Sequence, residues 1–327
     1  MRTFEELNDL IRAFQPSRAL LTALELDVFE AIGEGATAEK VAAAAGADPR
    51  ATGMLLNALV ALGALTKQAD TFHNTAVTAR HFRRGSPDDS RAALLHTANL
   101  WRRWSTLTDC VLAGTGLTRP DPPEVDAARI HAFIAAMHRN ASERAPHVLD
   151  ALDLSGVRRV LDLGGGSGAY AIAFAKAQPG LRAEVLDLPD VVGLTRGYAE
   201  AAGVADRVSA REGDIGQQSY GRGFDLVWIS QICHMMGPDE NRAMLRKARA
   251  ALAPGGRVAI QEFLLDPDRA GPPQAALFAL NMLVGTGRGN AYTEGDVCGW
   301  MREAGLADVA GVRLPGSTGL VVGRVGG

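Results

Sequence analysis

"VLDLGGGSGAY", residues 160–170, joins an apolar run directly to three glycines, a serine and a fourth glycine. The residues that follow, AIAFAKAQ, have the apolar spacing of a helix. A bare turn between a strand and a helix lets a ligand approach the backbone and meet the amide groups at the helix start. The spacing differs from the G-x-G-x-x-G of dinucleotide folds, and no P-loop lysine follows. A tight turn without a ligand is the alternative interpretation.

Acidic residues follow two later apolar runs. AEVLDLPDVV places Asp187 at the end of the next expected strand, where a carboxylate can accept hydrogen bonds from both hydroxyls of a ribose. VSAREGDI ends a third run at Asp214, which suits an exocyclic amine. The glycine loop and the two acids therefore predict three contact points for a nucleoside-containing ligand at successive strand ends.

The pattern of the chain changes near residue 157. Before it the sequence is mainly helical, and the order helix, helix, helix, hairpin over the first 75 residues is typical of a winged helix. After it, short apolar runs such as FDLVWISQI and RVAIQEFLL alternate with helical stretches. This alternation predicts a parallel α/β sheet with helices on both faces.

Composition excludes several classes of protein. The 327 residues are 47% hydrophobic and 22% charged, with a formal net charge of -3, which is not the basic balance of a nucleic-acid binder. Cys110, Cys233 and Cys298 have no zinc or disulfide spacing, which favours a reducing compartment. No signal peptide is recognisable, and no run reaches the ~18 uncharged apolar residues of a membrane-spanning helix. We expect a cytoplasmic protein that binds no membrane, no nucleic acid and no metal.

The motifs together resemble a known family. VLDLGGGSG, LDLPDV, EGD, a strand ending in histidine and LAPGGRV follow the order of the class I methyltransferases that use S-adenosylmethionine (SAM). More narrowly, nearly the whole chain is similar to small-molecule O-methyltransferases of the plant caffeate and acetylserotonin type and of bacterial natural-product pathways. The resemblance implies an α/β, Rossmann-like methyltransferase domain with a mainly helical, winged-helix N-terminal dimerisation domain. We expect dimerisation by residues 1–95, a helical linker and acceptor-pocket lid at 96–150, and SAM binding by 151–327.

The resemblance also implies the cofactor contacts. SAM would be bound and S-adenosylhomocysteine (SAH) released, with the bare loop holding the methionine portion. The expected cofactor-binding residues are Asp162, Gly164, Gly165, Gly166, Gly168, Asp187, Leu188, Gly213, Asp214, Ile215 and Ser230.

His234 and Glu262 are the expected catalytic residues. By resemblance, His234 removes the proton of a phenol or enol, and Glu262, 28 residues later, orients the ring. Imidazole suits a general base because it titrates near neutral pH, and a carboxylate partner stabilises the imidazolium that forms. A histidine that caps a strand end and a solvated carboxylate are the alternatives.

The sequence departs from the family pattern near His234. Met235 and Met236 replace the usual acid and tryptophan, and Ser230 stands where a lysine is often found. Ala291 occupies the expected position of the second flanking glutamate of the plant enzymes. These departures leave carbon or nitrogen methylation open, as well as a relative that keeps the cofactor but catalyses decarboxylation or hydroxylation.

The resemblance assigns the acceptor pocket to three helical segments, whose aromatic and thioether groups suit a flat aromatic or polyketide-like acceptor. Ordinary core packing is the alternative for each of these residues. Asn281 is the most informative, because a polar side chain in an apolar stretch needs a partner. The expected acceptor-binding residues are Trp101, Trp104, Phe133, Met137, His138, Phe278, Asn281 and Met282.

A winged-helix DNA-binding regulator is the rival hypothesis. Its candidate helices, TAEKVAAAAG and ATGMLLNALVALG, are apolar and nearly uncharged. They lack the arginines and lysines that contact phosphates. Because such helices need burial, we expect a second copy of the chain to provide it, giving a homodimer.

Overall fold

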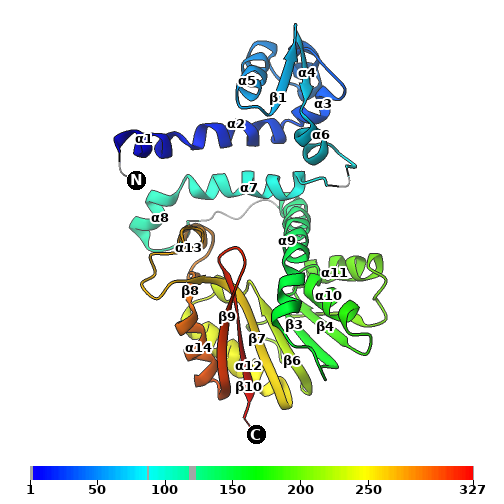
Figure 1. Cartoon of the computed structure of the whole chain (residues 1–327), viewed down its shortest axis with the longest axis vertical. Coiled ribbons are helices and arrows are strands. Elements are labelled where there is room, and N and C mark those ends of the chain that lie inside the picture. The colour runs from blue at the N-terminus through cyan, green and yellow to red at the C-terminus, as the bar shows by residue number, and fades with distance from the viewer. Residues whose placement is uncertain (1–2, 87, 118–122, 327) are drawn as a thin grey trace. The chain divides into compact units, whose positions relative to one another are not determined.

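The computed structural model describes residues 3–86, 88–117 and 123–326 (Figure 1). They divide into two compact units that meet in sequence between Arg102 and Arg103. Throughout these ranges, no helix is both long and apolar enough to cross a membrane.

The first unit is mainly helical. Its core contains Leu24, Phe29, Leu56, Leu59 and Phe72, all fully or almost fully buried. Its elements, in chain order, are α1 Phe4–Arg12, α2 Phe14–Glu25, α3 Val28–Ile32, α4 Ala38–Ala45, α5 Pro49–Ala61, β1 Leu65–Gln68, β2 Thr71–Asn74, α6 Ala76–Phe82 and most of α7 Arg91–Trp104, which crosses the unit boundary.

Local sequence signals explain the helix–hairpin order of this unit. Helix α5 begins at Pro49, and the Asp48 side chain accepts a hydrogen bond from the amide of Ala51 at 2.8 Å. Gly46 adopts a left-handed conformation (φ 62°) that ends α4. Strands β1 and β2 form the expected antiparallel hairpin, with Leu65 opposite Asn74. The winged-helix assignment itself stays a prediction.

The second unit is an α/β structure. Its helices are α8 Leu107–Ala113, α9 Pro123–Ala151, α10 Ala169–Ala177, α11 Pro189–Ala201, the 3-10 turn η1 Cys233–Met235, α12 Pro238–Ala251, α13 Pro273–Gly285 and α14 Glu294–Glu303. Its strands are β3 Arg159–Leu163, β4 Arg182–Asp187, β5 Val208–Glu212, β6 Phe224–Ser230, β7 Leu252–Leu265, β8 Tyr292–Thr293, β9 Leu306–Leu314 and β10 Thr318–Val325.

The sheet of this unit is mixed. Its strand order is β5-β4-β3-β6-β7-β10-β9, with β8 paired to β7 beside this path. Strands β3 to β7 are parallel, as the sequence predicts. Strands β9 and β10 were not predicted, and β10 runs antiparallel to both β7 and β9. The α/β fold class is therefore confirmed, with an antiparallel edge in addition.

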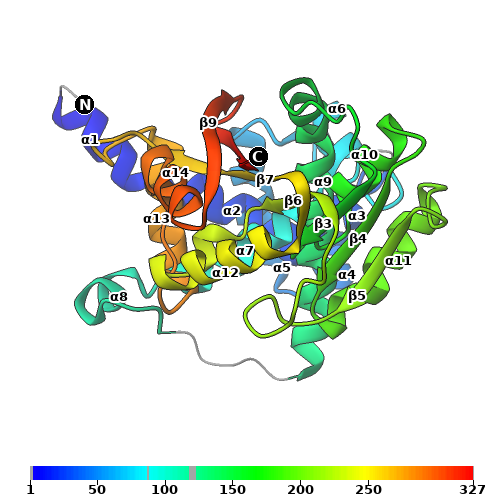
Figure 2. The same cartoon turned by 90° about the horizontal axis from the view of Figure 1, so that it is seen from below.

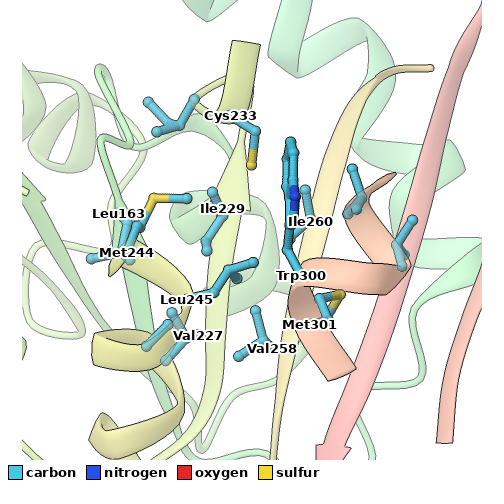
Figure 3. Packing of buried hydrophobic residues seen from close by; sticks show 14 of the residues in the cluster. Leu163, Val227, Ile229, Cys233, Met244, Leu245, Val258, Ile260, Trp300 and Met301 are labelled. Carbon is cyan, nitrogen blue, oxygen red and sulfur yellow. The ribbon is translucent and has the colours of Figure 1, made fainter. Parts of the chain in front are cut away.

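Helices cover both faces of the sheet (Figure 2). On one face, Ile229 and Ile260 of the strands pack with Met244 of α12 and with Trp300 and Met301 of α14 (Figure 3). The opposite face packs against α9, α10 and α11 through a second buried cluster. Burial on both faces explains why the parallel strands are nearly continuous apolar runs.

The strand order reverses between β3 and β6. Parallel strands end at the same edge, and ligands of open α/β sheets bind beyond that edge where the order reverses. The loop after β3 and the turn after β6 meet there, because a Cβ placed on Gly164 would lie 2.4 Å from Cδ1 of Ile232. The candidate site therefore lies at this reversal.

The α10 face of the core yields a stability prediction. Phe174 is fully buried, and its ring packs edge-on against Trp228 of β6, with centroids 5.2 Å apart. Phe174→Ala should lower the free energy of unfolding by about 3–5 kcal/mol, because it leaves a cavity under the sheet. Urea unfolding followed by circular dichroism measures this loss. Lys176→Ala, at an exposed position of the same helix, should stay within about 0.5 kcal/mol of wild type. Equal effects of the two changes would contradict the packing.

Candidate functional site

The loop between β3 and α10 requires glycine. Gly164, Gly166 and Gly168 have φ values of 64°, 58° and 72°, in the left-handed region that other residues rarely adopt. A Cβ on Gly165 would lie 2.6 Å from Oδ2 of Asp162. Side chains are therefore excluded from the four glycine positions for two separate reasons, which leaves the backbone there uncovered by side chains of its own.

Two residues outside the loop fix Gly166. Asp187, at the end of β4, accepts hydrogen bonds from the amides of Gly166 and Leu188, each at 2.7 Å. Burial raises the pKa of Asp187, and these two amides oppose that rise. Thr195 of α11 donates its hydroxyl to the Gly166 carbonyl at 2.6 Å. Each carboxylate oxygen of Asp187 can still accept a further hydrogen bond, while the Leu188 side chain is exposed.

Asp162 is a buried acid without a hydrogen-bond partner. It is 1% exposed, and neither carboxylate oxygen finds a donor among the described residues. Burial, and then the nearby charge of Asp187, raises the pKa of Asp162 to about 8. A buried acid of this kind is stable as the neutral form or beside a cation.

Further orphaned polar groups share the sheet face of Asp162. Trp228 is its partner on β6, and Ser230, two residues later, points to the same face as Trp228. Ser230 pairs in register with Gln261 and donates to its side-chain oxygen at 2.7 Å. The Gln261 amide nitrogen, the Trp228 ring N–H and the Tyr170 hydroxyl are buried without partners in the described structure. Such a concentration of orphaned groups calls for a bound polar ligand or ordered water.

The predicted third contact lies beside Asp187. The Gly213 amide donates to the Asp187 carbonyl at 2.9 Å, which holds the loop after β5 at the end of β4. Asp214 accepts hydrogen bonds from the Gly216 amide at 2.7 Å and the Gln217 side chain at 3.2 Å. Ile215 follows, and its carbonyl accepts from Tyr220 and Lys247. The three predicted strand-end contacts are thus neighbours in space.

His234 and Glu262 form a buried pair. Nδ1 of His234 lies 2.8 Å from Oε2 of Glu262, and the residues are 8% and 3% exposed. Glu262 also accepts the amides of His234 at 3.3 Å and Phe263 at 3.2 Å. Because Nδ1–H donates to the carboxylate, Nε2 keeps the lone pair that can take a proton. This carboxylate is not the solvated group of the alternative interpretation.

The turn that carries His234 is held by its neighbours. Strand β6 ends at Ser230, so His234 lies in η1 rather than at the strand end expected from sequence. Asn241 of α12, fully buried, donates its side-chain nitrogen to the carbonyls of Cys233, Met236 and Gly237 at 2.9–3.3 Å. Burial, and then the charge of Glu262, raises the pKa of the Cys233 thiol.

Several predicted acceptor residues lie near this pair or contact one another. The Phe278 ring packs edge-on against the His234 ring, with ring centroids 4.8 Å apart. It also packs against the Phe263 ring in a tilted arrangement, with centroids 4.5 Å apart. Asn281 has the partner that its sequence context required, because the Trp104 ring N–H donates to its oxygen at 3.0 Å. Met282, one residue later on α13, is buried.

The remaining predicted acceptor residues belong to α9 and α7. On α9, Phe133 is exposed and Met137 is half-buried. His138, also on α9, contacts the glycine loop through Ser167, at 2.8 Å from Nδ1 to Oγ. Trp101 belongs to the first compact unit. Contact of these residues with an acceptor stays a prediction.

Sequence reasoning missed four residues of this region: Tyr170, Thr195, Asn241 and Gln261. Gln261 offered a signal, since it is a polar residue within the apolar strand VAIQEFLL. Thr195 and Asn241 lie in helices of ordinary amphipathic pattern, which reveals nothing of their contacts. No group of three or more His, Cys, Asp or Glu residues in the described ranges could hold a metal ion.

Comparison with known proteins identifies the family. The model of the O-methyltransferase domain matches residues 121–307, and that of the O-methyltransferase dimerisation domain matches residues 8–84. A 3-hydroxy-5-methyl-1-naphthoate 3-O-methyltransferase from Streptomyces sahachiroi is 35% identical over 328 residues, which cover 97% of this chain and 94% of that protein.

Solved structures agree over the whole chain. PigF with SAH has a TM-score of 0.90 at 26% identity and covers 98% of this chain and 99% of its own. Human N-acetylserotonin methyltransferase in complex with SAM has a TM-score of 0.85 at 27% identity, with coverage of 100% and 99%. The chain therefore belongs to the family of SAM-dependent O-methyltransferases, with a dimerisation domain at its N-terminus.

Proposed function

We propose that the enzyme transfers the methyl group of SAM to a hydroxyl of a small aromatic or polyketide-like natural product, with His234 as the general base. The observation that supports this most strongly is the buried His234–Glu262 hydrogen bond of 2.8 Å, which leaves Nε2 free to accept a proton. The similar enzyme that acts on a hydroxynaphthoate supports the class of acceptor.

The residues around the glycine loop fit SAM. The methionine portion of SAM carries an ammonium group, and Asp162 is a buried acid with two oxygens that lack donors. We assign Asp162 to that ammonium, the backbone of the glycine loop at residues 164–168 to the methionine portion, Asp187 to the ribose hydroxyls and Asp214 to the adenine amine. When bound, SAM supplies an electrophilic methyl group to the acceptor oxygen and leaves as SAH.

His234 removes the acceptor proton as the oxygen becomes a nucleophile. The proton moves from the acceptor hydroxyl to Nε2, and Glu262 stabilises the imidazolium through Nδ1–H. Phe278, edge-on to the ring, and the carboxylate together hold the imidazole in one orientation. Alignment of the acceptor with the methyl group supplies several kcal/mol of the acceleration.

Removing the base tests this function. His234→Ala should lower kcat for a naphthol acceptor by about 10²-fold or more, and Glu262→Gln by about 10-fold to 10²-fold. The affinity for SAH should stay within about twofold of wild type in both variants. Transfer of a labelled methyl group from SAM to a panel of naphthols and anthraquinones measures the rates. Wild-type rates in His234→Ala would contradict the assignment of His234 as the general base. A labelled methyl group bound to carbon in the product would show that the enzyme methylates carbon rather than oxygen.

The raised pKa of Asp162 predicts that this residue loses a proton when the cofactor binds. Its pKa of about 8 in the free protein keeps it mainly neutral at pH 7, and a bound ammonium favours the ionised form. Cofactor binding should therefore release a proton below about pH 8, and affinity should rise as the pH rises toward that value. Calorimetry of SAH binding at pH 7, in two buffers of different ionisation enthalpy, counts the protons.

Asp162→Asn is the matched variant for that experiment. Asp162→Asn should bind SAH more weakly, and its binding should no longer release the proton of Asp162. Any proton that SAH itself gains or loses contributes equally to the wild-type and variant measurements. Equal proton release by wild type and variant would exclude Asp162 as the titrating group.

We also propose that the enzyme is a homodimer formed through its dimerisation domain. Helix α1 has no buried residue and is strongly amphipathic. Phe4, Leu7, Leu10 and Ile11 of α1, with Phe14 at the start of α2, form an apolar set that is exposed in the single chain. Apolar side chains at helical spacing on an unpaired helix favour burial against another chain.

A charge in this apolar set should weaken the dimer. Ile11→Glu should raise the dissociation constant of the dimer by at least about 10-fold, because it places a carboxylate in an apolar interface. Gln15→Glu adds the same charge at a polar, exposed position and is the control. Sedimentation velocity over a concentration series measures both. A wild-type protein that sediments as a monomer, or equal dimerisation of Ile11→Glu and wild type, would contradict the proposal.

We also propose that the enzyme is cytoplasmic. Cys110, Cys233 and Cys298 are all free thiols in buried positions. Free thiols persist in a reducing compartment, which supports the cytoplasm as the site of the reaction.

A further inference from the structure

His138 of α9 joins that helix to the glycine loop. Its Nδ1 lies 2.8 Å from the hydroxyl oxygen of Ser167, the loop residue between Gly166 and Gly168. Ser167 is 3% exposed, so this side chain points into protein rather than into solvent. A buried hydroxyl that loses its hydrogen-bond partner leaves an unsatisfied polar group, which costs more than the bond itself contributes.

A second helix holds His138 in place. The Tyr198 ring of α11 stacks on the imidazole, with centroids 4.0 Å apart and an interplanar angle of 21°. Tyr198 lies three residues after Thr195, so both side chains emerge from the same face of α11. Thr195 donates to the Gly166 carbonyl at 2.6 Å. Helix α11 therefore holds loop residue 166 directly and loop residue 167 through the ring of His138.

Helix α9 makes a second approach to the loop one turn earlier. A Cβ placed on Gly166 would lie 3.5 Å from Cδ1 of Ile134, four residues before His138. Residues four apart share one face of a helix, so this face of α9 is directed at the loop. Burial lowers the pKa of His138, which favours the neutral ring.

We propose that His138 is a positioning residue for the cofactor loop. Through Ser167 it holds the residues around Gly166 and Gly168 in the left-handed conformation that turns the loop backbone toward the cofactor. Its role is thus on the SAM side of the site rather than in the acceptor pocket to which sequence reasoning assigned it. The kinetic test rests on the proposed methyl transfer, whereas binding of SAH tests the loop independently of any acceptor.

Four variants separate the hydrogen bond from the ring stacking. His138→Phe keeps a ring against Tyr198 and removes the hydrogen bond, and Ser167→Ala removes its other end. His138→Asn keeps a polar atom near the position of Nδ1 and loses the ring. The double variant His138→Phe/Ser167→Ala tests whether the two residues act as one unit. His147→Phe, at an exposed position of the same helix, is the matched control.

Calorimetry with SAH and steady-state kinetics with SAM and a naphthol give the readouts. His138→Phe and Ser167→Ala should each raise the Kd for SAH and the KM for SAM by about 5-fold to 10-fold. The double variant should be no worse than either single one, and His138→Asn should recover most of the loss. The KM for the acceptor, and kcat at saturating SAM, should stay within about twofold.

Other outcomes overturn the proposal. A raised KM for the acceptor with an unchanged Kd for SAH would place His138 in the acceptor pocket. Additive losses in the double variant would mean that the two side chains act separately, and unchanged binding throughout would mean that the contact is incidental. If His138→Phe fails to fold, Ser167→Ala decides. Absence of methyl transfer by the wild type would contradict the proposed function. The Kd values for SAH would then still test the role of His138 in positioning the loop.

Discussion

The hydrogen bond between His234 and Glu262 requires two neighbouring strands to end at one edge of the sheet. Glu262 lies within β7, and His234 lies in the turn after β6, which is the parallel neighbour of β7. The pair is buried, so the two groups must satisfy one another. The backbone amides of His234 and Phe263 complete the coordination of the carboxylate. The hydrogen bonds of Asn241 from α12 hold the same turn, so η1 is fixed to both β7 and α12.

The same edge separates the two halves of the reaction. Strands β3, β4 and β5 present the glycine loop, Asp187 and Asp214 on one side of the reversal in strand order, and β6 and β7 present His234 and Glu262 on the other. Asp162 and Gln261 link the two halves on one face of the sheet, where their orphaned polar groups surround Trp228. The proposed proton transfer and cofactor binding therefore occupy adjacent strands.

The sequence predicted the parts of this site that have strong local signals. Glycines at left-handed positions, acids after apolar runs and a histidine after a strand are visible because each departs from its surroundings. The parallel strands β3 to β7 were predicted because their short apolar runs stand out from the helical stretches between them. Strand β9 was not, since LADVAGVRL is largely exposed on an outer strand and lacks the continuous apolar pattern of the buried ones. Strand β10 was not either, because its apolar run LVV is only three residues long and lies between two glycines. The position of His138 was also beyond the sequence, because helical spacing places a residue on a face of a helix but does not identify what that face contacts. The contacts of Asn241 could not be predicted either, because its partners are three backbone carbonyls and every residue has a backbone carbonyl.

In the proposed mechanism, Nε2 of His234 takes the proton of the acceptor hydroxyl. A crystal structure of the enzyme with SAH and a hydroxynaphthoate measures this most directly, through the distance between Nε2 and the acceptor oxygen. The account predicts a separation of about 2.6–3.2 Å, with the Nδ1–Glu262 hydrogen bond retained. An acceptor hydroxyl bound beyond reach of Nε2, with another side chain or a water-linked group at its oxygen, would contradict it.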